Sequence, residues 1–158
     1  MKAAIFFLCL LVPALSSAAT DTTFKGLDRL DVAIEKLDQA GEQTGLTQES
    51  LQSLVTVAIK RDIPTMRVEK GLGAYIYVVV TCKQTTASAT ACFVSVELTR
   101  PVKILKNDFN TEVGGTLGVV WDKGMLLHHP TTSMASKIRE EIEQEITDFA
   151  AEYYRQNP

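Results

Sequence analysis

The sequence predicts an α+β domain in two layers, with two helices on one face of a mixed β-sheet of about five strands. Two features carry this prediction: a central hairpin of β-branched and aromatic segments that contains two cysteines, and an amphipathic helix at the end of the chain. The chain has 158 residues, of which 46% are hydrophobic and 22% are charged. This length and composition fit one ordinary domain and exclude a disordered or collagen-like chain.

Residues 1–19 have the order of a secretory signal peptide. Lys2 precedes an apolar run over residues 3–15, and small residues follow at positions 16–19. The run is shorter than the roughly 20 residues that span a bilayer, and no later segment approaches that length. We therefore expect residues 20–158 to form one globular domain that is not an integral membrane protein, and that is periplasmic or secreted from a bacterium. Cys9 would be lost with the peptide.

Two strands are predicted at residues 74–82 and 92–98, joined by a small, polar loop. With Cys82 opposite Cys92, one face of this hairpin is entirely apolar, through the pairs Val80 with Val94, Val78 with Val96 and Ile76 with Leu98. Paired thiols persist as disulfides in an oxidising compartment. The sequence therefore predicts a structural cross-strand disulfide between Cys82 and Cys92.

The apolar alternation continues to about Leu105. Pro101 interrupts it, which indicates an edge, a bulge or a change of partner. A strand interrupted by three glycines is expected at residues 113–121. A turn at residues 122–124 would then precede a short apolar strand at residues 125–127.

Two helices are predicted. The clearer one is C-terminal, with Ser133 or Thr132 as its N-cap and apolar residues at three- and four-residue steps: Met134, Ile138, Ile142, Ile146, Phe149 and Tyr153. The other begins after Thr47 as N-cap, with Leu46 and Leu51 at the positions of a hydrophobic staple. It ends before Pro64, and a short strand follows at residues 65–69.

Residues 27–37 fit either type of element. Leu27, Leu30, Ile34 and Leu37 have helical spacing, whereas Leu30, Val32 and Ile34 alternate as in a strand. A window this short does not separate the two by periodicity.

The order of these segments resembles a group of small exported bacterial proteins of unknown function. The matching segments are the helix opening at residues 45–51, strands at 74–78 and 94–98, Trp121 with Gly124, and the end of the chain from Phe149 to Pro158. The resemblance implies a strand before the first helix, which favours a strand at residues 27–37. It supports fold and compartment, and it transfers no functional residue.

The sequence offers little for catalysis, and we lean towards a protein that is not an enzyme and has no cofactor. His128 and His129 are adjacent, so in an extended chain their rings point to opposite sides, and no other ligand stands at metal-binding spacing. We interpret them as a surface linker pair. No nucleophile elbow or phosphate-binding loop occurs. The net charge of −3 gives no basic footprint for nucleic acid.

Tyr75, Tyr77 and Phe93 lie on the hairpin face opposite the apolar one, and they form a candidate partner patch if that face is exposed. The alternative is that another element covers this face or that the rings pack on one another. Our leading hypothesis is a non-catalytic module that binds an envelope protein through this patch or an open strand edge. A small-molecule or lipid site between sheet and helices is second, and a hydrolase third. The sequence leaves the oligomeric state open.

Overall fold

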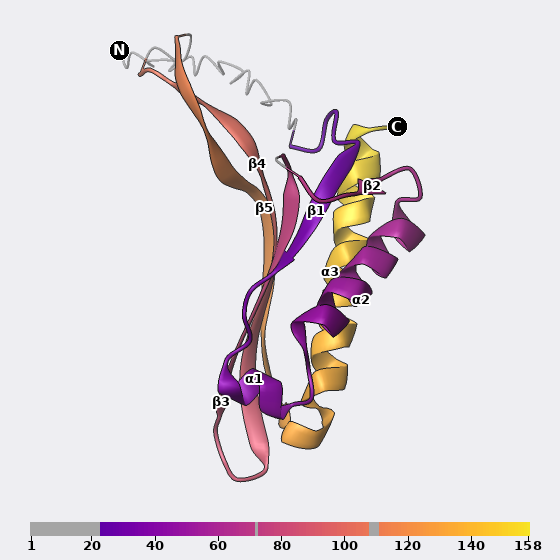
Figure 1. The fold of residues 1–158 in the computed structure, drawn as a ribbon, viewed down its shortest axis with the longest axis vertical. Coiled ribbons are helices and arrows are strands. Elements are labelled where there is room, and N and C mark those ends of the chain that lie inside the picture. Colours follow the sequence, from indigo (N-terminus) through magenta and orange to yellow (C-terminus); the bar gives the residue numbers. More distant parts are fainter. Residues whose placement is uncertain (1–22, 72, 108–110) are drawn as a thin grey trace, which may run out of the picture.

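The computed structural model describes residues 23–71, 73–107 and 111–158, so the signal peptide expected at residues 1–19 lies outside the described part. The described chain folds into one five-stranded sheet with helices on one side (Figure 1). The strands are β1 (Arg29–Ile34), β2 (Arg67–Val68), β3 (Tyr75–Gln84), β4 (Ala89–Leu105) and β5 (Glu112–Pro130). The helices are α1 (Gln39–Gln43), α2 (Gln48–Asp62) and α3 (Thr131–Gln156). The predicted α+β class is confirmed.

The sheet is mixed, with the strand order β2-β1-β3-β4-β5. β1 pairs in parallel with both β2 and β3, whereas β3 with β4 and β4 with β5 are antiparallel. Residues 27–37 therefore contain a strand, as the resemblance implied. Because β1 is the first strand in sequence and lies between β2 and β3, both of its neighbours are supplied by later parts of the chain.

The predicted register of the central hairpin is confirmed. Cys82 lies opposite Cys92, and the apolar pairs above it follow in the expected order down to Ile76 opposite Leu98. The two cysteines form a disulfide with an S–S distance of 2.08 Å, and both are buried. This cross-link is typical of proteins that fold outside the cytoplasm.

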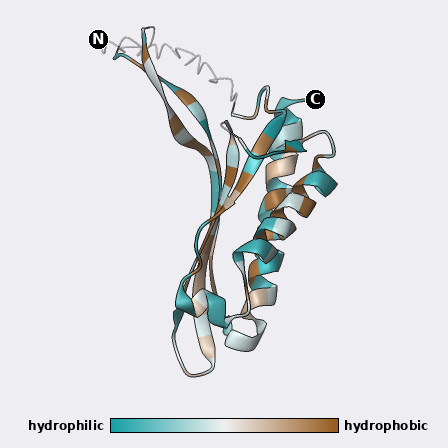
Figure 2. Ribbon diagram, viewed as in Figure 1, coloured by the Kyte–Doolittle hydropathy of each residue, from teal (hydrophilic) through white to brown (hydrophobic). Residues whose placement is uncertain are grey.

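One continuous core fills the space between the sheet and its helical layer. α3 lies over β4 and β5, and α2 packs beside it over β1 (Figure 1). Figure 2 shows apolar residues along the strands and polar residues on the outward faces of the helices. The fully buried side chains from both layers include Leu30, Leu51, Ile59, Ile76, Leu98, Ile138, Ile142 and Phe149. None of the helices in the described part combines the length and apolar content that crossing a bilayer would take.

The start of α2 is built as the sequence predicts. Thr47 Oγ1 accepts a hydrogen bond from the Ser50 backbone N–H at 3.1 Å, and Ser50 Oγ accepts one from the Thr47 N–H at 3.2 Å. This reciprocal capping box satisfies two amides at the helix start. Leu46 and Leu51, the expected staple, are both buried.

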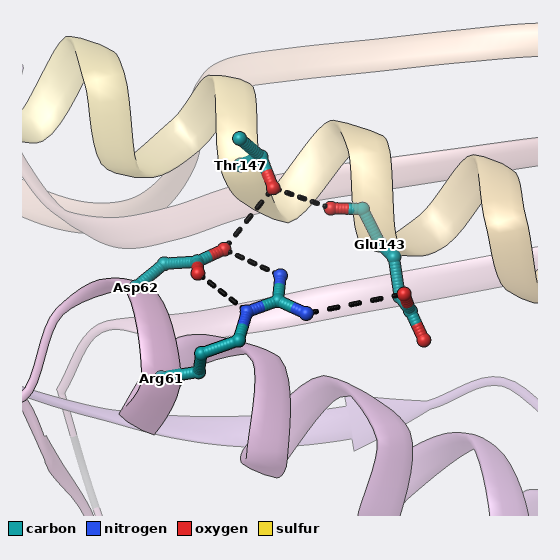
Figure 3. Close-up of polar contacts among 4 residues, drawn as sticks. All are labelled: Arg61, Asp62, Glu143 and Thr147. Carbon is teal, nitrogen blue, oxygen red and sulfur yellow. Dashed lines mark hydrogen bonds and ion pairs between the residues drawn. The ribbon is translucent and has the colours of Figure 1, made fainter.

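A polar cluster joins α2 to α3 on the surface (Figure 3). Arg61 and Asp62 form a two-bond ion pair, with N–O distances of 2.6 and 2.8 Å. The hydrogen bonds from Arg61 lower the pKa of Asp62. Thr147 Oγ1 lies 3.1 Å from Asp62 Oδ2 and 3.0 Å from the Glu143 carbonyl oxygen. Because exposed ion pairs contribute little to stability, we expect this cluster to add little to the free energy of unfolding.

The turn predicted at residues 122–124 is wrong, because β5 runs through it as one strand of 19 residues. Gly124 lies opposite Ser95. A Cβ on Gly124 would stand 3.1 Å from the Phe93 ring, so this glycine makes room for a cross-strand aromatic side chain instead of a turn.

The interpretation of His128 and His129 as a linker is also wrong, since they pair with Ala91 and Thr90 of β4.

Two helix assignments also need correction. α3 begins at Thr131 with Pro130 in the N-cap position and no side-chain cap, so neither Ser133 nor Thr132 caps it. α1 was not predicted. Its N-cap, Asp38, accepts hydrogen bonds from the backbone N–H groups of Gly41 and Cys82, both at 2.7 Å. The second bond ties α1 to β3, and such a tertiary contact has no signature in local sequence.

Glu145 is a buried carboxyl on the face of α3 that meets the sheet. Its exposed fraction is 7%, and within the described residues its Oε2 atom has no hydrogen-bond partner. Burial, together with the neighbouring Glu141 and Asp148, raises the pKa of Glu145 to about 7, against the lowering influence of Lys123. The folded state therefore favours the neutral carboxyl, whereas the unfolded chain ionises at its ordinary pKa.

The disulfide should stabilise the fold by constraining the unfolded chain. Cys82 and Cys92 are separated by 10 residues, and on the chain-entropy model a loop of this length corresponds to roughly 2 to 3 kcal/mol. Replacing both cysteines with alanine should lower the free energy of unfolding in urea by about that amount. An unfolding midpoint that is unchanged in the double variant would show that the cross-link does not contribute.

The Glu145→Gln variant should be more stable than the native protein above pH 7. The folded-state pKa exceeds the unfolded value, so the stability that Glu145 contributes as a neutral group is lost as pH rises from the unfolded pKa near 4.5 to about 7. Urea unfolding should show a gain on the order of 1 kcal/mol at pH 8 and almost none at pH 4. Glu69→Gln, at an exposed site, is the control; an equal gain there would contradict the assignment.

Candidate interaction surface

The face of the sheet opposite the helices, called here the outer face, is not covered by any element in residues 23–71, 73–107 and 111–158 (Figure 1). The register places Tyr75, Tyr77, Phe93, Glu97, Asp122 and Leu126 on it. All three residues of the predicted partner patch therefore lie on this face. The structure brings two of them together and separates the third.

Tyr75 and Tyr77 form the tyrosine pair of the outer face. Their ring centroids are 6.3 Å apart in an edge-to-face arrangement, and both side chains are half-buried. The Tyr77 hydroxyl donates a hydrogen bond to Glu35 Oε2 at 2.5 Å. This bond, burial and the charges of Glu35 and Glu97 raise the pKa of Tyr77. The rings do pack on each other, but they also keep a solvent-facing surface.

Phe93 lies apart from the tyrosines. It stands four positions along β4 from Glu97, the residue opposite Tyr77, which is roughly 13 Å at strand spacing. Its neighbour across the sheet is Leu126, and the two side chains are 46% and 72% exposed. The sequence pattern does not place Leu126 on this face, because a turn at residues 122–124 would remove it from β5. Phe93 and Leu126 form a second apolar group on the outer face.

Beside the tyrosine pair lies a pair of like charges. Glu97 and Asp122 are directly opposite across β4 and β5. Within the residues that the structure describes, neither carboxylate forms an ion pair, and Glu97 accepts only a 3.2 Å hydrogen bond from Ser95. Like charges in this position destabilise a sheet. The outer face is thus an acidic, aromatic surface whose charge is not neutralised from within the described chain.

The open edge of the sheet is β5, which pairs with β4 alone. Met125 and Leu126 are 46% and 72% exposed along it. Exposed edges are normally blunted by short strands, prolines, bulges or inward charges. β5 instead has 19 residues, and its one proline is the last residue. Its protection consists of the two irregularities in its pairing with β4, at Leu98/Thr99 and Ile104/Leu105, and the side chain of Lys123. Such an edge can accept another strand.

Beyond the start of β3, where Tyr75 pairs with Thr99, the strands β4 and β5 continue as a two-stranded arm that leaves the rest of the sheet (Figure 1). Pro101 lies in it, past the register irregularity at Leu98 and Thr99, which agrees with the predicted edge or bulge. Apolar segments are visible on the arm (Figure 2), and its exposed apolar side chains are Ile104, Leu105, Val113, Leu117 and Val119.

The histidines and one surface cavity complete the description of the candidate sites. They contain no group of three or more His, Cys, Asp or Glu side chains placed to hold a metal. His128 Nε2 lies 3.0 Å from Thr85 Oγ1. A cavity of about 430 Å³ lies at the surface between α1 and the start of α2, beside Leu37, Leu46 and Thr47, and not between sheet and helices.

Replacing Asp122 with lysine should stabilise the protein. The change converts the Glu97 and Asp122 repulsion into a cross-strand ion pair, which corresponds to roughly 0.2 to 1 kcal/mol. Thermal unfolding in low salt should shift upwards, and the gain should shrink in 0.5 M salt because exposed charges are screened. A loss of stability in low salt would show that the two carboxylates do not repel each other in the folded state.

No family model and no curated protein matches the chain. The solved structures that are distantly similar to the chain include the following two. A PelC dodecamer from Paraburkholderia phytofirmans is 13% identical with a TM-score of 0.47, covering 76% of this chain and 84% of that one. A minor lipoprotein from Acinetobacter baumannii is 9% identical with a TM-score of 0.25, covering 82% of this chain and 91% of that one.

Proposed function

We propose that this protein is a non-catalytic binding module of the bacterial envelope that holds a partner protein on the outer face and the β5 edge. One observation carries the proposal: the helices cover only one side of the sheet, and the other side presents Phe93 and Leu126 beside a long open edge. A contiguous exposed apolar surface of this kind marks interaction sites in soluble proteins.

The chemistry of the outer face favours a protein with a basic, extended segment. An open strand edge binds another strand through main-chain hydrogen bonds, and alternate side chains supply specificity. The tyrosine pair offers rigid rings, on which a lysine or arginine can lie. Glu97 and Asp122, which repel each other in the free protein, would both gain from a cation placed between them.

A periplasmic location fits this role. The Cys82 and Cys92 disulfide favours an oxidising compartment, and the sequence of residues 1–19 predicts export. In that compartment the protein would fold first, and its outer face, with the charges of Glu97 and Asp122 still unpaired, would then bind the partner.

Photocrosslinking in intact cells tests the proposal. A photoreactive amino acid placed at Tyr77 or at Leu126 should give a discrete adduct with an envelope protein. The matched control is Val57, which is 65% exposed on α2, on the other side of the molecule. The adduct at the Tyr77 position should disappear when Asp122 is replaced by lysine, because the acidic pair is lost.

Equal labelling from the Tyr77, Leu126 and Val57 positions, or no adduct from either sheet position, would overturn the proposed function. The variants carry changes at exposed or half-exposed sites, and circular dichroism of each purified protein would verify that it is folded.

A further inference from the structure

We infer that the β5 edge pairs with the β5 edge of a second copy of this chain, antiparallel and about a two-fold axis at Met125. The inference rests on the proposed role of this edge as a binding surface. It names a second copy as the occupant of the β5 edge, and it leaves the tyrosine pair and the acidic pair of the outer face to the envelope protein. Pairing over residues 121–129 would join two five-stranded sheets into one sheet with all helices on the same side.

The self-complementary sequence of β5 selects this register. A two-fold axis at Met125 places Gly124 opposite the partner's Leu126, and Asp122 opposite the partner's His128. Directly opposite residues share a face of the sheet, so both pairs lie on the outer face. An axis at Lys123 would instead set two lysines against each other, a like-charge pair that a sheet disfavours.

The side chains around Gly124 provide the shape for this contact. The Phe93 ring leans over Gly124, within 3.1 Å of the place where a Cβ would stand. The partner's Leu126, opposite Gly124, would lie against that ring and lose much of its exposed surface. The two-fold axis repeats this contact. Leu126 of each copy, the most exposed of the large apolar side chains of β5, would therefore become buried.

The side of the β5 edge that faces the helical layer is also open to a second copy. Lys123 and Met125 point towards the helical layer, yet both are exposed, whereas Trp121 and Leu127 on the same side of β5 are buried. Burying the exposed parts of Phe93, Met125 and Leu126 would remove roughly 300 Å² of apolar surface per copy, about half of the smallest stable interfaces. The paired main chains add to this area. The association should therefore be concentration-dependent.

Cysteine cross-linking tests the register. Across the proposed axis the two Met125 Cα atoms would be about 4.5 to 5.5 Å apart, within the range that a disulfide bridges. Met125→Cys should therefore yield a covalent dimer under mild oxidation of the purified full chain. Lys123→Cys is the matched control, because the two copies of this residue would be roughly 13 Å apart along the strands.

Sedimentation equilibrium gives an independent measure. Leu126→Lys should raise the dimer dissociation constant at least tenfold, whereas Val57→Lys, the same kind of change at a similarly exposed site, should leave it unaltered. A native protein that stays monomeric at hundreds of micromolar would overturn the inference. So would a Lys123→Cys dimer that forms as fast as the Met125→Cys dimer.

The two proposals fail separately. If the native protein is monomeric but Leu126 still crosslinks to a different envelope protein, self-pairing is excluded and the binding function stands. If Met125→Cys dimerises and neither Tyr77 nor Leu126 reaches another protein, the edge serves the second copy and the proposed envelope partner is excluded.

Discussion

The register between β3 and β4 is the constraint on which the rest of this structure depends. With Cys82 opposite Cys92, every even-numbered residue from Ile76 to Val80 faces the helices and every odd-numbered one faces solvent. A slip by one residue would exchange the two faces. The disulfide makes such a slip impossible in the oxidised protein, and β1, β5 and both long helices are positioned against the face that this register defines.

The sequence alone predicts those elements whose strand partner or helix cap lies close by in the chain. The hairpin was predictable because cysteine spacing and apolar alternation agree, and α2 because Thr47 and Leu51 mark its start. The course of β5 was not predictable in this way. Asp122, Lys123 and Gly124 are typical of a turn, and only their pairing with β4 keeps them extended. α1 depends likewise on the bond from Asp38 to Cys82.

The candidate interaction surface was likewise predictable only in part from the sequence. Alternation along each strand, together with the predicted register of the hairpin, places Tyr75, Tyr77 and Phe93 on one face, because strand residues two apart share a side. Their separation into two groups, and the place of Leu126 beside Phe93, followed from the true length of β5. The acidic pair could not be found from sequence, since Glu97 and Asp122 meet only through the register of two strands.

The inner face is optimised for packing, whereas the outer face and the β5 edge hold features that weaken an isolated domain. Opposed carboxylates, exposed leucine and unpaired strand groups do not help this chain to fold. Sites that break local rules of stability are commonly sites of function. This contrast between the two faces is the physical reason for placing the proposed binding function on the outer side.

The position of β1 has a consequence for the kinetics of folding. β3, β4, β5 and α3 are consecutive in the chain and contact one another through short connections, so they can assemble as a local unit. β1 must instead wait for residues 75–78, its partners in β3, more than forty positions later. Closing that loop carries an entropic penalty before any pairing is gained. In a chain that emerges N-terminus first, β1 is made early and docks late, and until then its apolar side chains need protection from aggregation.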